Sequence, residues 1–321
     1  MNKRLSARMS VSSVLWRPSP SAPQTKKDLY MKKLFLMNIV LLFAFVSCAK
    51  PAKAAENPEK SQNQQQSEKT ESAKEEKIVN PEFVKLNNVL SSMSDRCKEA
   101  IPNGNPQEFL DDLHKVLDSE SEFSSTDLSP FYLIDKKHNV SSDYEPQNLI
   151  HLEKNELFEI NKNSLSLRPE AFEALKILAA AAKKDGITLT VSSTYRSYEY
   201  QKNLFDYWVS VDGLYEAERE SARPGTSQHQ LGMAMDFAPV DDAFDKTPAG
   251  AWVYKNAANY GWSLSFPQNY EDVTGYRWEC WHFRYIGVEA CKFQKKWFGD
   301  VQQFMIEFID AWKNYENQPE F

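Results

Sequence analysis

The spacing of apolar side chains predicts helices at both ends of the folded part of the chain. After Pro81 and again after Pro106, apolar residues recur every three or four positions, as on one face of a helix. The same pattern returns at 304–312, close to the end of the sequence. We therefore expect a helical N-terminal segment over 81–143 and a C-terminal helix within 296–321.

Between these ends, helical and extended patterns alternate. A helix is predicted from Pro169 to Lys184, because proline favours a helix start. Lysines in the last turn and Gly186 just beyond it are signals for the end of a helix. Strands rich in β-branched or apolar residues are predicted at 187–192, 233–237 and 282–286. One further helix is predicted at 198–209. Since short links join these elements, we expect an α+β fold with a small, largely antiparallel sheet flanked by helices, over 144–295.

The composition fits a soluble globular protein with polar extensions. Of the 321 residues, 41% are hydrophobic and 26% are charged, and the mean hydropathy is −0.59. The net charge of −7 is unevenly distributed, because residues 1–47 carry +7 and residues 48–321 carry −14. Nucleic-acid binding requires clustered Lys and Arg, so the acidic body of the chain argues against a nucleic-acid partner.

The start of the chain predicts an export signal. Residues 1–30 show no helical or strand periodicity, and we interpret them as an upstream mis-start or a disordered tail. Residues 31–47 combine two lysines with an apolar run of 13 residues, which is typical of a signal peptide. About 20 apolar residues are needed to span a bilayer, although a retained membrane anchor is the alternative. Ser47 before Cys48 resembles a bacterial lipobox, so we expect Cys48 to be lipidated.

The segment 48–80 has almost no large apolar residues, so it cannot bury enough surface to offset the entropy of ordering. We expect a disordered linker that follows a lipid anchor at Cys48. The protein would then be an exported bacterial cell-envelope protein, in the periplasm or on the outer surface, that contacts a membrane only through this anchor.

Three cysteines remain after Cys48, and an odd number cannot all pair within one chain. Cys280 and Cys291 lie 11 positions apart, and they either form a disulfide in an oxidising compartment or stay free thiols. The sequence leaves this choice open.

Two of the five histidines stand in sequences that suggest metal chemistry. His229 and Asp236 belong to one polar and glycine-containing segment, and His282 follows Glu279 in an aromatic one. Two imidazoles and a carboxylate are a common ligand set for catalytic zinc, and they leave a position for water. By itself this set is weak, since a histidine among aromatic residues usually belongs to a core. Positions three apart on a strand face opposite ways, so Glu279 is expected on a bend before the strand of His282.

The sequence around these residues resembles that of the VanY-type D-alanyl-D-alanine carboxypeptidases, which are zinc metallopeptidases of the bacterial cell wall. The shared pattern is Ser-x-His-x-x-Gly-x-Ala-x-Asp, followed 40–50 residues later by Glu-x-Trp-His-Phe-Arg-Tyr. Further short motifs match those of the family and occur in the same order, at 193–197, Gln201, Trp252, 256–257, 260–261 and 274–276. The resemblance covers about residues 144–290. Cys280, where the family usually has Pro, and Thr194, where Gly is common, depart from the pattern.

The resemblance implies a D-Ala-D-Ala metallopeptidase fold, also called hedgehog-like, with one Zn²⁺ per chain held by His229, Asp236 and His282. Glu279 would be the general base, and Arg196 would face the scissile carbonyl. The residues implied in substrate binding are Gln201, Ser227, Tyr195 and Trp281. Ser227 has an alternative role as a local helix cap, and Trp281 as part of the core.

The expected activity is removal of the terminal D-Ala from peptidoglycan stem peptides. Two alternatives stay open: an L,D-carboxypeptidase that acts on tetrapeptide stems, and a non-catalytic lipoprotein that binds peptidoglycan. The expected partner is in each case the stem peptide.

Overall fold

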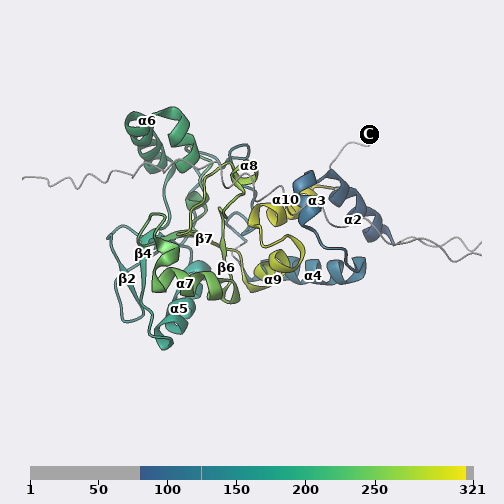
Figure 1. Ribbon diagram of the computed structural model, residues 1–321, viewed down its shortest axis with the longest axis horizontal. Coiled ribbons are helices and arrows are strands. Elements are labelled where there is room, and N and C mark those ends of the chain that lie inside the picture. The colour runs from purple at the N-terminus through teal and green to yellow at the C-terminus, as the bar shows by residue number, and fades with distance from the viewer. Residues whose placement is uncertain (1–79, 124, 316–321) are drawn as a thin grey trace, which may run out of the picture. The chain divides into compact units, whose positions relative to one another are not determined.

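A five-stranded mixed sheet supports the predicted site (Figure 1). The computed structural model describes residues 80–123 and 125–315. In sheet order, the strands are β2 (Phe158–Ile160), β4 (Leu189–Ser193), β5 (Ala234–Phe237), β7 (His282–Tyr285) and β6 (Trp262–Leu264). Only β2 and β4 pair in parallel within this sheet, and the other neighbours are antiparallel. The expected α+β fold with a small, largely antiparallel sheet is confirmed.

Helices precede, separate and follow the strands along the chain. They are α2 (Pro81–Ser92), α3 (Asp95–Ala100), α4 (Pro106–Ser119), α5 (Pro169–Lys184), α6 (Tyr198–Glu220), α7 (Pro248–Asn256), α8 (Glu271–Thr274), α9 (Val288–Trp297) and α10 (Gln302–Lys313). Short 3₁₀ turns lie at η1 (Glu120–Glu122), η2 (Gln228–Leu231), η3 (Phe244–Lys246) and η4 (Ala257–Tyr260), and β1 (Ile150–His151) pairs with β3 (Ser166–Leu167). Within the described part of the chain, none of the helices combines the length and the apolarity needed to cross a membrane.

Prolines and capping side chains fix where several helices begin. Pro81, Pro106 and Pro169 each occupy a first position, where the missing N–H is no loss. Asn80 and Asn105 accept hydrogen bonds from the backbone of the first turns that follow them. The starts that the sequence predicted for α2, α4 and α5 are therefore confirmed.

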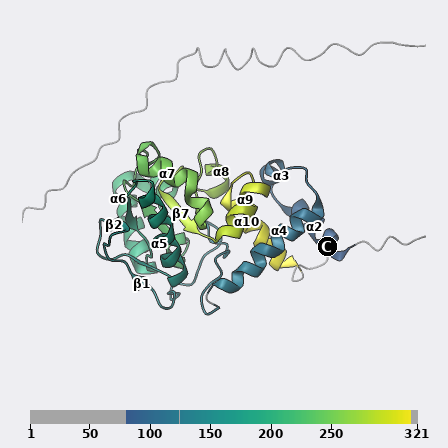
Figure 2. The same ribbon diagram turned by 90° about the horizontal axis from the view of Figure 1, so that it is seen from below.

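One core lies between α5 and the sheet, and Figure 2 shows α5 in front of the strands. The buried face of α5 includes Leu175 and Leu178, which belong to the same cluster as Leu189 of β4 and Phe237 of β5. Trp262 of β6 is fully buried in this cluster. Burial of such side chains stabilises the fold by about 1.5–3 kcal/mol each. This core fixes the strands that carry the site.

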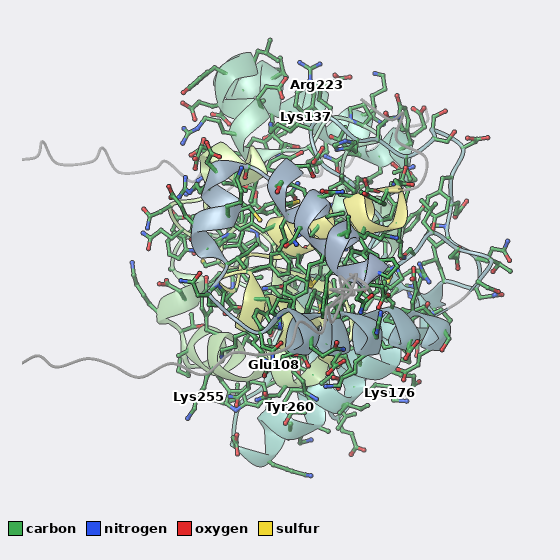
Figure 3. All side chains as sticks on the ribbon, turned by 90° about the vertical axis from the view of Figure 1, so that its right-hand side faces the viewer. Glu108, Lys137, Lys176, Arg223, Lys255 and Tyr260 are labelled. Carbon is green, nitrogen blue, oxygen red and sulfur yellow. The ribbon has the colours of Figure 1, made fainter. Side chains whose placement is uncertain are left out.

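A second core joins the N-terminal helices to the C-terminal ones. Residues of α2, α3 and α4 share one buried cluster with residues of α9 and α10, and Figure 3 views this side of the molecule. The ring of Phe109 on α4 packs at 5.0–5.2 Å from the rings of Phe293, Trp297 and Phe308. The predicted boundary between 144–295 and 296–321 falls within α9 and within this cluster.

Helix α6 is longer than the helix predicted at 198–209. It continues to Glu220 across Gly213, whose φ of 81° and ψ of 164° interrupt the helical backbone. The second half carries mostly polar residues, so apolar spacing alone did not reveal it.

The cysteines of the described residues are free and buried. Cys97, Cys280 and Cys291 form no disulfide with one another, which answers the question that the sequence left open. Cys280 donates its thiol to the carbonyl oxygen of Asp241 at 3.4 Å, and burial raises its pKa to about 11. The expectations for 1–30, 31–47 and Cys48, and for the linker up to residue 79, lie outside the described residues.

Candidate active site

Three predicted metal ligands meet at one end of the sheet. Asp236 on β5 pairs in register with His282 on β7, and His229 lies on the turn η2. Oδ1 of Asp236 is 3.0 Å from Nδ1 of His282, and Oδ2 is 3.4 Å from Nε2 of His229. One ligand atom from each residue lies within 4.8 Å of the others. In residues 80–123 and 125–315, no other group of His, Cys, Asp and Glu side chains converges in this way.

The hydrogen bonds of the two imidazoles determine which nitrogen of each ring is available. Nδ1 of His229 lies 2.6 Å from the carbonyl oxygen of Thr194, which only accepts, so Nδ1 carries the proton and Nε2 keeps its lone pair. Nε2 of His282 lies 3.2 Å from Oε1 of Gln228, which leaves Nδ1 with the lone pair by the same reasoning. Metal-binding histidines commonly use one nitrogen in this way and donate from the other.

Two of the converging atoms are buried without a hydrogen bond. Nε2 of His229 and Oδ1 of Asp236 find no hydrogen-bond partner among the described residues. Buried polar atoms are normally satisfied, because desolvation otherwise costs free energy. A cation between the three side chains would satisfy both atoms, so the donor set fits a metal ion.

The protonation states also fit. Burial, reinforced by the charge of Arg196, lowers the pKa of His229 to about 4, so this imidazole is neutral at physiological pH. Burial alone would raise the pKa of Asp236, but the neighbouring His229 and His282 hold it well below its usual range. Neutral histidine and ionised aspartate are the forms that bind metal ions.

Glu279 lies beside the three residues, on the bend that the sequence predicted. Its backbone N–H donates to Phe266, and its carbonyl accepts from the N–H of His282, which closes a tight turn before β7. Its Oε2 is 3.7 Å from Nδ1 of His282. Burial, and then the negative charge of Asp236, raise the pKa of Glu279 well above its usual range. A carboxyl group in such an environment is suited to accept and release a proton.

Arg196 connects this group to the wall of a cavity. Its Nη2 donates to Oδ2 of Asp236 at 2.8 Å, its Nε to Ser193 at 3.0 Å and its Nη1 to Gln201 at 3.2 Å. These contacts use three of the five guanidinium N–H donors. The side chain is 18% exposed and lines the cavity. Arg196 therefore holds the carboxylate of Asp236 and retains donors for a substrate.

The expected role of Gln201 as a direct substrate contact is not supported by its position. The side chain is fully buried, and Nε2 donates to Oγ of Ser221 at 3.2 Å and to the carbonyl of Ala222 at 2.7 Å. Both amide protons are thus used, and Oε1 accepts from Arg196. Gln201 does not line the cavity. We correct its role to that of a support for Arg196.

Ser227 takes its alternative role as a local cap, and its role in substrate binding stays a prediction. Its Oγ accepts from the backbone N–H of His229 at 3.3 Å and so caps η2, while the residue also lines the cavity. Tyr195 and Trp281 do not line it. Tyr195 is half-buried, and burial followed by the charge of Glu145 raises its pKa to about 12. Trp281 is 7% exposed and packs in the core beside the sheet, where its large apolar ring is removed from water.

The cavity includes residues for which the sequence predicted no role in the site. Phe266 and Tyr276 lie in its wall, and Tyr276 belongs to the Thr-Gly-Tyr sequence that resembled the family. Asp135 and Gln303 come from the N-terminal segment and α10, and Nε2 of Gln303 donates to Asp135 at 2.9 Å. Glu220, at the end of α6, adds another carboxylate. No motif marked Asp135, Gln303 or Glu220.

Comparison with known proteins supports the family that these residues suggested. A family model described as VanY, D-alanyl-D-alanine carboxypeptidase, matches residues 164–288. A protein named YodJ from Bacillus subtilis (strain 168) is 40% identical over 166 residues, which are 50% of this chain and 61% of YodJ. The bifunctional D-Ala-D-Ala dipeptidase and carboxypeptidase VanXYC of Enterococcus gallinarum is 29% identical over 50% of this chain and 85% of its own length.

Among solved structures, the LdcB LD-carboxypeptidase matches with a TM-score of 0.50 and 36% sequence identity. The match covers 56% of this chain and 87% of the LdcB chain. The matching motifs, the convergent side chains and this coverage lead to one assignment: the chain belongs to the VanY family of D-alanyl-D-alanine carboxypeptidases.

Proposed function

We propose that this protein is a zinc-dependent carboxypeptidase that removes the terminal D-Ala from peptidoglycan stem peptides. The observation that carries the proposal is the convergence of His229, Asp236 and His282, with two buried atoms that lack hydrogen bonds, next to Glu279 in a cavity. The name of the relative VanXYC includes D-Ala-D-Ala carboxypeptidase activity, which supports the choice of substrate.

Zinc suits this donor set, because two imidazole nitrogens and one carboxylate oxygen are a common catalytic ligand set with one position left open. Nε2 of His229, Nδ1 of His282 and a carboxylate oxygen of Asp236 would hold one ion per chain. When bound, zinc would lower the pKa of the attacking water towards about 7 and polarise the scissile carbonyl.

The protein side chains would manage the proton and the developing charge. Glu279 would accept the proton of the attacking water and deliver it to the amine of the departing D-Ala, a role commonly worth about 10²–10⁴ in rate. Its buried position favours the protonated form between these two transfers. The free donors of Arg196 would stabilise the negative oxygen that forms at the carbonyl, at about 3–4 kcal/mol per donor.

A specific observation also favours a second candidate. The LdcB structure, 36% identical to this chain, is described as that of an LD-carboxypeptidase. An L,D-carboxypeptidase would use the same ligands and the same base but would cleave tetrapeptide stems. A non-catalytic binding protein would not need a base, and here Glu279 stands within 3.7 Å of a candidate ligand.

The test is release of D-Ala by the zinc-loaded full-length chain from a pentapeptide stem and from a tetrapeptide stem. We expect release from the pentapeptide. Release from the tetrapeptide alone would establish the second candidate instead. No release from either, or a Glu279→Gln variant as active as the wild type, would overturn both. Glu289→Gln on α9, a carboxylate away from the cavity, is the matched control.

We propose in addition that the chain is exported and anchored by a lipid on Cys48. The support is the sequence alone: an apolar run after two lysines, with Ser47 before Cys48. Mass spectrometry of the mature protein tests this proposal. A lipid-modified N-terminus at Cys48 is the expected result, and an intact unmodified Cys48 peptide within a longer chain would contradict it.

A further inference from the structure

We infer that Gln228, held in place by Ser265 and Gln302, is a positioning residue that fixes His282 as a metal ligand. The inference rests on the metal site of the proposed function, and it concerns the protein groups behind that site. It assigns a role to the start of α10, which lies beyond the residues 164–288 that match the family model.

The first step is the contact between Gln228 and His282. Oε1 of Gln228 lies 3.2 Å from Nε2 of His282, and both side chains are buried. An amide oxygen only accepts, so this contact selects the imidazole tautomer with the proton on Nε2. The lone pair of Nδ1 is then directed to the side of Asp236, whose Oδ1 is 3.0 Å away. Gln228 therefore sets both the tautomer and the ring orientation of this ligand.

The second step is the orientation of the Gln228 amide itself. Oγ of Ser265 donates to the same Oε1 at 2.7 Å, so the amide oxygen receives two hydrogen bonds. A reversed amide would place its NH₂ group against the N–H of His282 and lose that bond. Ser265 follows β6 directly and its backbone N–H donates to the carbonyl of His282 at 3.3 Å. Ser265 thus contacts both the ligand and the residue that orients it.

The third step reaches α10. The single hydroxyl proton of Ser265 is shared between Oε1 of Gln228 at 2.7 Å and Oε1 of Gln302 at 3.2 Å. Nε2 of Gln302 donates to the carbonyl of Ser263 at 3.2 Å. Gln302 and Ser265 are 1% and 2% exposed. These buried polar side chains form a continuous chain of contacts. Burying polar groups costs more desolvation free energy than burying apolar ones, so their presence here indicates that they position His282. The first residue of α10 is thereby connected to the candidate ligand His282.

The experiment measures zinc affinity of the metal-free full-length protein by competition with a chelator. Gln228→Leu removes the acceptor, and we expect zinc binding about 10–100-fold weaker, the usual effect of losing such a partner. Gln228→Glu keeps an acceptor for Nε2 of His282 and adds negative charge, so its affinity should equal or exceed that of the wild type. The absorption spectrum of the Co²⁺ form should change in Gln228→Leu only. Equal weakening in both variants, or unchanged affinity in both, would overturn the inference.

The role of α10 has its own matched pair. Gln302 and Gln294 are both buried glutamines that hydrogen-bond to Ser263, but only Gln302 also contacts Ser265. We expect Gln302→Leu to weaken zinc binding by roughly 3–10-fold and Gln294→Leu to leave it within about twofold, although both lower thermal stability. Equal zinc affinities in the two variants would overturn the part assigned to α10.

The two proposals fail in different ways. If the wild type binds zinc but releases no D-Ala from either stem peptide, the proposed activity is wrong, while the affinity ratios still decide the role of Gln228. If the wild type releases D-Ala and the Gln228→Leu protein binds zinc as tightly as the wild type, the positioning role is wrong and the activity stands.

Discussion

Replacement of Glu279 by glutamine should separate activity from stability. Glu279 is 8% exposed, and burial followed by the charge of Asp236 raises its pKa well above the usual value of about 4.3. The folded metal-free protein therefore binds a proton at this group more tightly than the unfolded chain does. The stability that this proton gives is present at low pH and is lost as pH rises through the folded-state pKa. Above the folded-state pKa, the ionised carboxylate opposes folding.

The magnitude follows from that burial. A glutamine in place of Glu279 would keep the shape of the side chain and remove its charge, and changes of this kind commonly stabilise by about 0.5–2 kcal/mol. For a folded part of this size, each kcal/mol corresponds to about 2–4 °C in Tm. We therefore expect Glu279→Gln to raise the Tm of the metal-free protein by about 1–8 °C at pH 7. Loss of the proposed general base should lower kcat by about 10²–10⁴.

The assay is thermal unfolding of metal-free wild type and Glu279→Gln between pH 4 and pH 8, together with D-Ala release by the zinc-loaded forms. The stability difference should shrink as pH falls towards 4, because the wild-type carboxyl then becomes neutral in both states. A variant that is less stable than the wild type at every pH would refute the reasoning about burial. A kcat within threefold of the wild type would refute the assignment of the base.

Three further changes test the packing outside the site. Burial alone would raise the pKa of Asp112, but hydrogen bonds, first that of Lys296, lower it to about 2. Asp112→Asn should therefore lower the free energy of unfolding by about 1 kcal/mol at pH 7. In urea unfolding, this loss should shrink as pH falls from 4 to 2. Gly250→Ala would place a Cβ 1.8 Å from the carbonyl oxygen of Phe244, so we expect a loss of about 1–3 kcal/mol or more in the same assay. Phe308→Ala should cost about 3–5 kcal/mol, because it empties a fully buried position where the terminal helices meet, and loss of helical circular dichroism at lower urea would show it.

The control for these variants is Ile177→Ala on α5, whose side chain is 60% exposed. We expect a change within about 0.5 kcal/mol. A pH-independent effect of Asp112→Asn would contradict the ion-pair account, and wild-type stability of Gly250→Ala or Phe308→Ala would contradict the packing described for those positions.

The local pattern of the sequence was sufficient to predict most elements that carry the site. The strand that ends near Asp236, the strand that begins at His282 and the bend at Glu279 follow from β-propensity and from side-chain alternation, which act over a few residues. The pairing of β5 with β7, which brings Asp236 beside His282, needed the resemblance to a known family, because a spacing along the chain does not specify a pairing.

The remaining contacts depend on tertiary structure. Gln201 carries the same side chain whether it meets a substrate or Arg196, and only its fully buried position decides between them. Asp135 and Gln303 reach the cavity from segments 168 residues apart, and neither lies in a recognisable motif. Trp281 was ambiguous because an indole fits a core and a pocket wall equally well.

The core shared by the two ends of the described chain sets an order for folding. Asn88 on α2 hydrogen-bonds to Tyr315, 227 residues later, and Phe109 packs against residues of α9 and α10. At about 5–20 residues per second, a ribosome needs roughly 10–45 s to bridge that interval. During this time the apolar faces of α2 and α4 lack their partners on α9 and α10. Helix α10 therefore completes the packing of α2 and α4, and a premature stop before α10 would leave these two helices without their shared core.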